Sequence, residues 1–262
     1  MSLLRGLCIL LLALAWAPAQ AAKIPPIAAA ADLKFALEEI ALSFRHETGH
    51  QLKLSFGSSG NFTHQIEQGA PFELFLSADE NFVFRLADKG LTRDRGTLYG
   101  IGRLVLFAPH HSQLTVDSEL RGLKAALEAG RIRRFAIANP DHAPYGRAAR
   151  AALEYAGLWS LLQPRLVLGE NASQATQFAA SGSSQGGIVP LSLSKAEAVA
   201  RLGSFALIPA EWHSAEPLRQ RMVLLKSGGD TACAFYAYLQ QPAAREIFLR
   251  YGFLLPDEAA QR

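Results

Sequence analysis

Short apolar runs alternate with amphipathic stretches along most of this 262-residue chain, and this alternation restricts its fold more than any other feature. One run, Leu104–Ala108, is continuously apolar, as expected for a strand that is buried on both faces of a sheet. Helical spacing follows the first run, Ile27–Ala31, and ends near Gly49. Strands that alternate with helices in this way predict an α/β fold with mostly parallel sheets.

The alternation falls into two blocks that no flexible linker separates. We therefore predict two lobes, each a mostly parallel sheet flanked by helices, joined by crossing strands near Leu104–Ala108 and Met222–Leu225. The predicted boundaries assign residues 23–103 and 226–262 to lobe 1, and residues 104–225 to lobe 2.

The N-terminus has the pattern of an export signal. Arg5 precedes an apolar segment, Gly6–Trp16, and the small residues of Ala17–Ala21 follow it. This apolar segment has about 11 residues, whereas a membrane-spanning helix needs roughly 20. We therefore predict that residues 1–22 are a removable signal peptide and that the mature protein is exported and soluble.

Composition excludes several classes of function. A formal net charge of +3 is too small to indicate nucleic-acid binding. Only Cys233 remains after removal of the predicted signal peptide, so an intramolecular disulfide cannot form. The chain contains no phosphate-loop or metalloprotease motif, and we expect its 7 scattered histidines to lie on the surface.

Four segments share one local pattern, in which a strand ends, small or hydroxyl residues follow, and a helix begins. They are Ala31-Asp32, Ser58-Ser59-Gly60, Pro144-Tyr145-Gly146 and Asn171-Ala172-Ser173. Helix N-termini offer free N–H groups and the positive end of the helix dipole to an anion. Because two segments belong to each block, a cleft between lobes can gather all four. Each segment taken alone is equally compatible with an ordinary helix cap.

The segment Gly182–Gly186 fits the letter pattern of a hydrolase nucleophile elbow, with Ser184 as the nucleophile. That elbow requires a strand before the serine and a helix after it. Here a helix precedes the serine and the strand Gly187–Val189 follows, which is the reverse order. We interpret the segment as the turn after a helix and keep an exported hydrolase only as an alternative.

Several longer motifs occur in matching order and resemble the periplasmic molybdate-binding components of ABC importers, a type II periplasmic binding protein family. They include Ala29–Leu33, Gly57–Gly60, Gln65–Pro71, Leu76–Asp79, Gly102–Val105, Asn139–Gly146, Gly187–Val189 and Ile247–Phe253. The resemblance covers nearly the whole mature chain. It implies a monomeric periplasmic protein that closes on molybdate or tungstate and delivers it to an ABC permease in the inner membrane. It implies no enzymatic activity, no cofactor and no direct ligation of the metal by the protein.

The resemblance also implies which residues bind the oxyanion. Ser59 matches a serine contact of the family, Tyr145 resembles the contact after the Asn-Pro turn, and Ala172 falls at a backbone N–H contact. The full set of implied positions is Ala31, Asp32, Ser59, Tyr145 and Ala172, with Ser58 and Asn171 as secondary candidates.

Asp32 departs from the family pattern, because members carry Ser or Asn at this position. A carboxylate about 4 Å from an anion would cost roughly 4 kcal/mol at an effective dielectric near 20. We therefore expect its side chain to turn away and cap the helix that begins at Leu33, which leaves its N–H for the ligand. The alternative is that the protein binds another oxyanion or a small organic acid.

Overall fold

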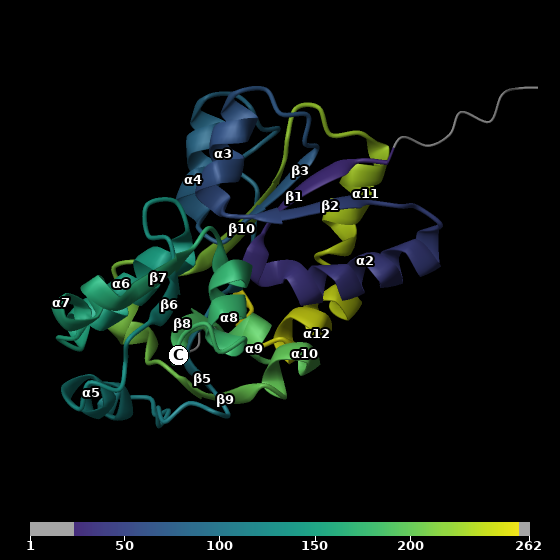
Figure 1. The fold of residues 1–262 in the computed structure, drawn as a ribbon. Helices are drawn as coiled ribbons and strands as arrows, with labels where there is room; N and C mark the ends of the chain where they lie inside the picture. The colour runs from purple at the N-terminus through teal and green to yellow at the C-terminus, as the bar shows by residue number, and fades with distance from the viewer. Residues whose placement is uncertain (1–23, 257–262) are drawn as a thin grey trace, which may run out of the picture.

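A computed structural model describes residues 24–256, which form two lobes, each built on a five-stranded sheet (Figure 1). The first sheet has the order β2-β1-β3-β10-β4 and the second the order β7-β6-β8-β5-β9. The first contains β1 (Pro26–Ala30), β2 (Lys53–Gly57), β3 (Leu74–Ser77), β4 (Thr97–Ile101) and β10 (Arg219–Leu224). The second contains β5 (Leu104–Pro109), β6 (Phe135–Ala138), β7 (Leu166–Gly169), β8 (Gly187–Pro190) and β9 (Gly203–Leu207). The predicted signal peptide, residues 1–22, lies outside the described residues.

Helices cover both faces of each sheet. Those of the first lobe are η2 (Ala31–Leu33), α2 (Lys34–Thr48), α3 (Ser59–Glu67), α4 (Glu80–Asp88), α11 (Asp230–Tyr238) and α12 (Pro242–Arg250). Those of the second lobe are α5 (Arg121–Glu128), α6 (Pro144–Tyr155), α7 (Trp159–Leu162), η3 (Gln163–Arg165), α8 (Ala172–Ala180), α9 (Leu191–Ser194) and α10 (Glu197–Ala200). The short η4 (Ala210–His213) precedes β10. From residue 24 to residue 256, every helix is too short or too polar to cross a bilayer.

The strands alternate their side chains between two apolar layers, one on each face of the sheet. In β6, Phe135 and Ile137 enter the layer formed with α5, α6 and α7. Ala136 and Ala138 enter the opposite layer, where α8 packs. The first sheet has the same construction, with α2, α11 and α12 on one face and α3 and α4 on the other (Figure 1). This double burial explains why inner strands such as β6 are apolar throughout.

Each sheet combines parallel and antiparallel pairs. β1 is parallel to both β2 and β3, and β6 is parallel to both β7 and β8. The two strands next to the crossings, β10 and β5, are antiparallel to their neighbours. The predicted fold class is therefore confirmed as a two-lobed α/β protein with parallel strands at the centre of each sheet.

The chain passes between the lobes twice, and one crossing differs from the prediction. The first crossing is at Gly102-Arg103, between β4 and β5, next to the predicted boundary. The second lies between β9 and β10, and β10 pairs with β3 and β4 of the first sheet. Residues 219–225 thus belong with lobe 1, although the predicted boundary assigned them to lobe 2. An apolar strand such as Met222–Leu225 has the same pattern in either sheet, so the sequence did not reveal its partner.

Candidate anion-binding site

The four predicted segments meet at one small cavity between the lobes, of about 10 Å³. They converge because β1 and β2 are parallel neighbours, as are β6 and β7, so the following helices start at the same edge of each sheet. Most of the predicted positions line this cavity: Ala31, Asp32, Ser58, Ser59, Tyr145 and Ala172. That these residues bind a ligand stays a prediction.

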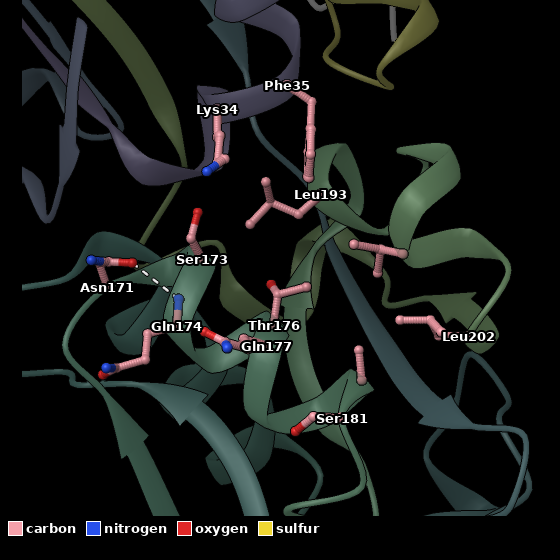
Figure 2. Close-up of a pocket in the computed structure, with 12 residues that line it drawn as sticks. Lys34, Phe35, Asn171, Ser173, Gln174, Thr176, Gln177, Ser181, Leu193 and Leu202 are labelled. Carbon is pink, nitrogen blue, oxygen red and sulfur yellow. Dashed lines mark hydrogen bonds between the residues drawn. The ribbon is translucent and has the colours of Figure 1, made fainter.

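Asn171 is the predicted position that lies elsewhere. It is the N-cap of α8, where its Oδ1 accepts the Gln174 backbone N–H at 3.1 Å. Its side chain lines a separate pocket of about 450 Å³, which adjoins the anion cavity. Figure 2 shows Lys34 and Phe35 facing Ser173 and Leu193 across this pocket. The cap fixes the N-terminus of α8, and this is how Asn171 contributes to the cavity.

Serines of the first lobe form one wall of the cavity. Ser58 is the N-cap of α3, and its Oγ accepts the Asn61 backbone N–H at 3.3 Å. Ser59 is fully buried, and its Oγ accepts the Ala78 backbone N–H at 3.0 Å. A hydroxyl that accepts one hydrogen bond still has its own proton to donate. Ser59 can therefore donate to an anion while it holds the Ala78 turn in place.

Two helix N-termini of the second lobe form the opposite wall. Pro144 occupies the first position of α6, where the missing N–H costs nothing, and Tyr145 follows it. Ala172 is the first residue of α8. The N–H groups of a helix's first turn have no partners within the helix, so these two termini can offer donors to a ligand. None of the residues that line the cavity has a positively charged side chain, so these N–H groups would bind an anion without one.

Asp32 does not cap a helix, and that expectation is wrong. Neither η2 nor α2 has a side-chain cap. Instead, Asp32 Oδ2 accepts the Nε2 group of Gln220 at 2.7 Å. The same Gln220 Nε2 donates to the Tyr145 hydroxyl at 3.1 Å, and the Tyr99 hydroxyl donates to Gln220 Oε1 at 2.7 Å. The other Asp32 oxygen, Oδ1, is buried and has no hydrogen-bond partner.

Burial dominates the electrostatics of Asp32, which is 1% exposed. Loss of water raises the pKa of its carboxyl from the ordinary 3.8 to about 6, against the opposing effect of hydrogen bonds from Gln220 and Tyr145. Burial likewise raises the pKa of Tyr145 well above its ordinary value, and the nearby Asp32 charge raises it further. Tyr145 therefore stays protonated, and the groups that stabilise an ionised Asp32 are neutral.

Direct hydrogen bonds hold the lobes together around the cavity. The Gly60 N–H donates to the His142 carbonyl at 3.0 Å. The Ser173 hydroxyl donates to the Ala31 carbonyl, and the Ser192 hydroxyl to the Asp32 carbonyl, each at 2.8 Å. The two serine contacts bind the same turn that carries Asp32. The structure therefore describes a closed arrangement of the lobes.

An ion-pair network lies beside the cavity. Arg147 of α6 contacts the Asp79 carboxylate across the lobes, and its Nε is 2.9 Å from Glu216 Oε2. Its guanidinium also lies over the Phe82 ring, 5.4 Å from the centroid. These partners occupy Arg147, so its charge is already compensated by two carboxylates.

Sequence reasoning missed several residues of the site. Gln220 and Tyr99 complete the Asp32 network from β10 and β4, and nothing in their local sequence marks them. The expectation of surface histidines is wrong for His213, which is 5% exposed, while His142 is half-buried. His142 Nδ1 shares a hydrogen bond with Ser58 Oγ at 2.9 Å across the lobes. The only local sequence feature that could have indicated a role for His142 is the Asn-Pro turn that precedes it.

Ser184 lies in the turn that the sequence predicted. α8 ends at Ala180 and β8 begins at Gly187, so a helix precedes the serine and a strand follows. Its hydroxyl is buried and donates to backbone carbonyls, that of Phe178 at 3.1 Å and that of Gly186 at 2.9 Å. These contacts close the turn, and the order required for a nucleophile elbow does not occur here.

Two lobes that close over a small cavity, lined by helix N-termini from both sides, define a class of protein that captures a solute. Residues 26–254 match the family described as bacterial extracellular solute-binding protein. The chain belongs to this family.

Individual relatives span almost the same length. A protein of Rhodobacter capsulatus named molybdate-binding protein ModA is 36% identical over 87% of this chain and 86% of its own. The protein of the same name from Azotobacter vinelandii is 37% identical over 90% of this chain and 91% of its own length. The solved periplasmic molybdate-binding protein of Azotobacter vinelandii superimposes with a TM-score of 0.80 at 32% identity, covering 88% of this chain and 99% of that one.

The buried Asp32 predicts how stability depends on pH. Its raised pKa means that the unfolded chain ionises first, so stability falls as pH rises from about 3.8 to about 6 and the loss is complete above that. We expect Asp32→Asn to raise the free energy of unfolding at pH 8 by up to about 3 kcal/mol. Near pH 4 the variant and the wild type should have nearly the same free energy of unfolding, and this comparison serves as the internal control. Urea denaturation across this range measures it, and a variant less stable than the wild type at pH 8 contradicts it.

Proposed function

We propose that this protein captures molybdate, and also tungstate, in the cavity between its lobes and delivers the anion to an ABC permease. We further propose that the mature protein acts in the periplasm as a monomer, without a cofactor and without catalysing a reaction. The observation that carries the proposal is the convergence of helix N-termini from both lobes on one cavity that no lysine, arginine or histidine lines. Relatives named molybdate-binding proteins over nearly the full chain support the choice of anion.

The geometry suits an anion that is bound by neutral hydrogen-bond donors rather than by positively charged side chains. Backbone N–H groups at Ala31, Asp32 and Ala172, together with the Ser59 hydroxyl, would replace the water that hydrates the anion. Closing the lobes removes the remaining water, so each hydrogen bond to the anion becomes stronger. The anion in turn favours the closed arrangement, because only that arrangement brings both walls to it.

The main alternative is another small oxyanion or a small organic acid in the same site. Asp32 is the observation that favours it, because a carboxylate is unusual beside a bound anion. Titration calorimetry of the mature protein with molybdate, tungstate, sulfate and phosphate separates the two proposals. We expect molybdate and tungstate to bind at micromolar concentration or below, and an excess of sulfate or phosphate not to displace them. Absence of molybdate and tungstate binding would overturn the proposal.

Removing the Ser59 hydroxyl should weaken binding. A hydrogen bond to a charged group contributes about 1.5–3 kcal/mol, so we expect Ser59→Ala to reduce molybdate affinity by about 10-fold to 150-fold. Calorimetry measures the change. Ser183→Ala is the matched control, because Ser183 is exposed and its hydroxyl pairs only with Ser181. Equal affinities for Ser59→Ala and Ser183→Ala would show that Ser59 is not a ligand.

Gly60 tests the role of closure. A Cβ at this position would lie 2.6 Å from the His142 carbonyl oxygen of the other lobe, which is too close. Within the helix itself, alanine is favoured over glycine by about 1 kcal/mol. We therefore expect Gly60→Ala to weaken molybdate binding at least tenfold while the melting temperature of the ligand-free protein does not fall.

The control for this variant is Gln65→Ala, an exposed position on the same helix. It changes helix propensity without touching the other lobe, so its molybdate affinity should equal that of the wild type. Small-angle scattering with saturating molybdate should show Gly60→Ala to be more open than the control. A Gly60→Ala variant that closes and binds normally would contradict this account.

A further inference from the structure

Asp32 Oδ1 is the one buried carboxylate oxygen without a hydrogen-bond partner among residues 24–256. It belongs to a side chain that is 1% exposed and lies in the lining of the anion cavity. A buried polar atom without a partner costs about 1–3 kcal/mol, so folded proteins rarely retain one without a reason. A ligand in the cavity can supply the missing partner.

The partners of the other oxygen determine where a proton can sit. Oδ2 accepts a hydrogen bond from Gln220 Nε2 at 2.7 Å, so this atom acts as an acceptor. In the orientation that the structure gives it, the Gln220 amide presents Nε2 to Asp32 and Oε1 to the Tyr99 hydroxyl, which lies 2.7 Å away. Oδ1 has no partner, so a proton placed there disturbs no hydrogen bond of this arrangement. In that state Oδ1 becomes an O–H donor on a residue that lines the cavity.

Among residues 24–256, no cation is among the groups that shift the pKa of Asp32. The titratable groups that act on it from the packed elements are Tyr99 on β4 and Tyr145 on α6, and both are held in the neutral form by burial. Gln220 on β10 is neutral, and the Ser192 hydroxyl on α9 donates to the Asp32 carbonyl. Arg147, beside the cavity, is paired with Asp79 and Glu216.

We propose that Asp32 binds the anion as a neutral acid, donating a hydrogen bond from Oδ1, and that one proton enters the site with each anion. This inference rests on the proposed function, because it assigns a role within the same cavity. An ionised Asp32 would repel the anion in a site that excludes water, whereas the neutral acid attracts it. The proton comes from solvent as the lobes close. Burial, against the opposing hydrogen bonds, already raises the pKa of this carboxyl to about 6, and an adjacent anion raises it further.

The protonation of Asp32 also bears on which anions fit. A neutral Asp32 is a donor, so it suits an oxyanion that carries no proton of its own and accepts from every side. An ionised Asp32 would be an acceptor, and Oδ1 would then suit an oxyanion that keeps one proton, such as hydrogen phosphate. The neutral state of Asp32 therefore favours a fully deprotonated oxyanion, and the ionised state favours one that keeps a proton.

The experiment is calorimetric titration of the mature protein with molybdate between pH 6 and pH 8, in buffers of different ionisation enthalpy. We expect the wild type to take up close to one proton per anion at pH 8. Its affinity should fall by up to tenfold for each pH unit in this range. Asp32→Asn, which keeps the shape and donor of the neutral acid, should take up no proton and should bind more tightly than the wild type at pH 8. Asp141→Asn, at an exposed position of the Asn-Pro turn, is the matched control and should behave as the wild type.

A second measurement is the infrared difference spectrum between molybdate-bound and free protein. The C=O stretch of a protonated carboxyl should appear on binding in the wild type and be missing in Asp32→Asn. Molybdate binding without proton uptake, or equal uptake by Asp32→Asn, overturns this inference and leaves the proposed function intact. Preferential binding of phosphate overturns both, as does a failure of the wild type to bind molybdate at any pH.

Discussion

The site depends on the parallel pairing of two strands in each lobe, β1 with β2 and β6 with β7. Parallel neighbours end at the same edge of a sheet, so the helices that follow them begin side by side. Two such edges that face each other can surround an anion with N–H groups and helix dipoles. Such an arrangement requires no lysine or arginine, and none lines the cavity.

A site built from neutral donors is sensitive to any charge added to it, and Asp32 is such a charge. The fold places a polar network behind this residue, with Gln220 from the crossing strand β10 and Tyr145 from the second lobe. Gln220 contacts groups of both lobes, so the strand that returns the chain to lobe 1 also links the two walls of the cavity. The network satisfies one carboxylate oxygen and leaves the other without a partner.

The sequence predicted the features that depend on local pattern. Alternating apolar runs predicted two α/β lobes, and the strand-turn-helix segments around Ser59 and Tyr145 predicted elements that do line one cavity. Long-range contacts could not be predicted this way. Gln220 lies 188 residues from Asp32, and no local pattern marks their pairing. The expected Asp32 cap was wrong for the same reason, because a tertiary partner replaced the local one.

Closure itself depends on contacts that the anion does not touch. The Gly60 N–H and the hydroxyls of Ser173 and Ser192 join backbone carbonyls across the lobes. Gly60 and Ser173 follow residues of the cavity wall, and Ser192 binds the carbonyl of one. Individually, such neutral bonds contribute about 0.5–1.5 kcal/mol, so they bias the lobes toward closing without fixing them shut. A transported ligand must leave again, so a closed state of modest stability is what release requires. The Asp32 carboxyl belongs to the turn that two of these bonds hold, so its burial in this arrangement depends on contacts between the lobes.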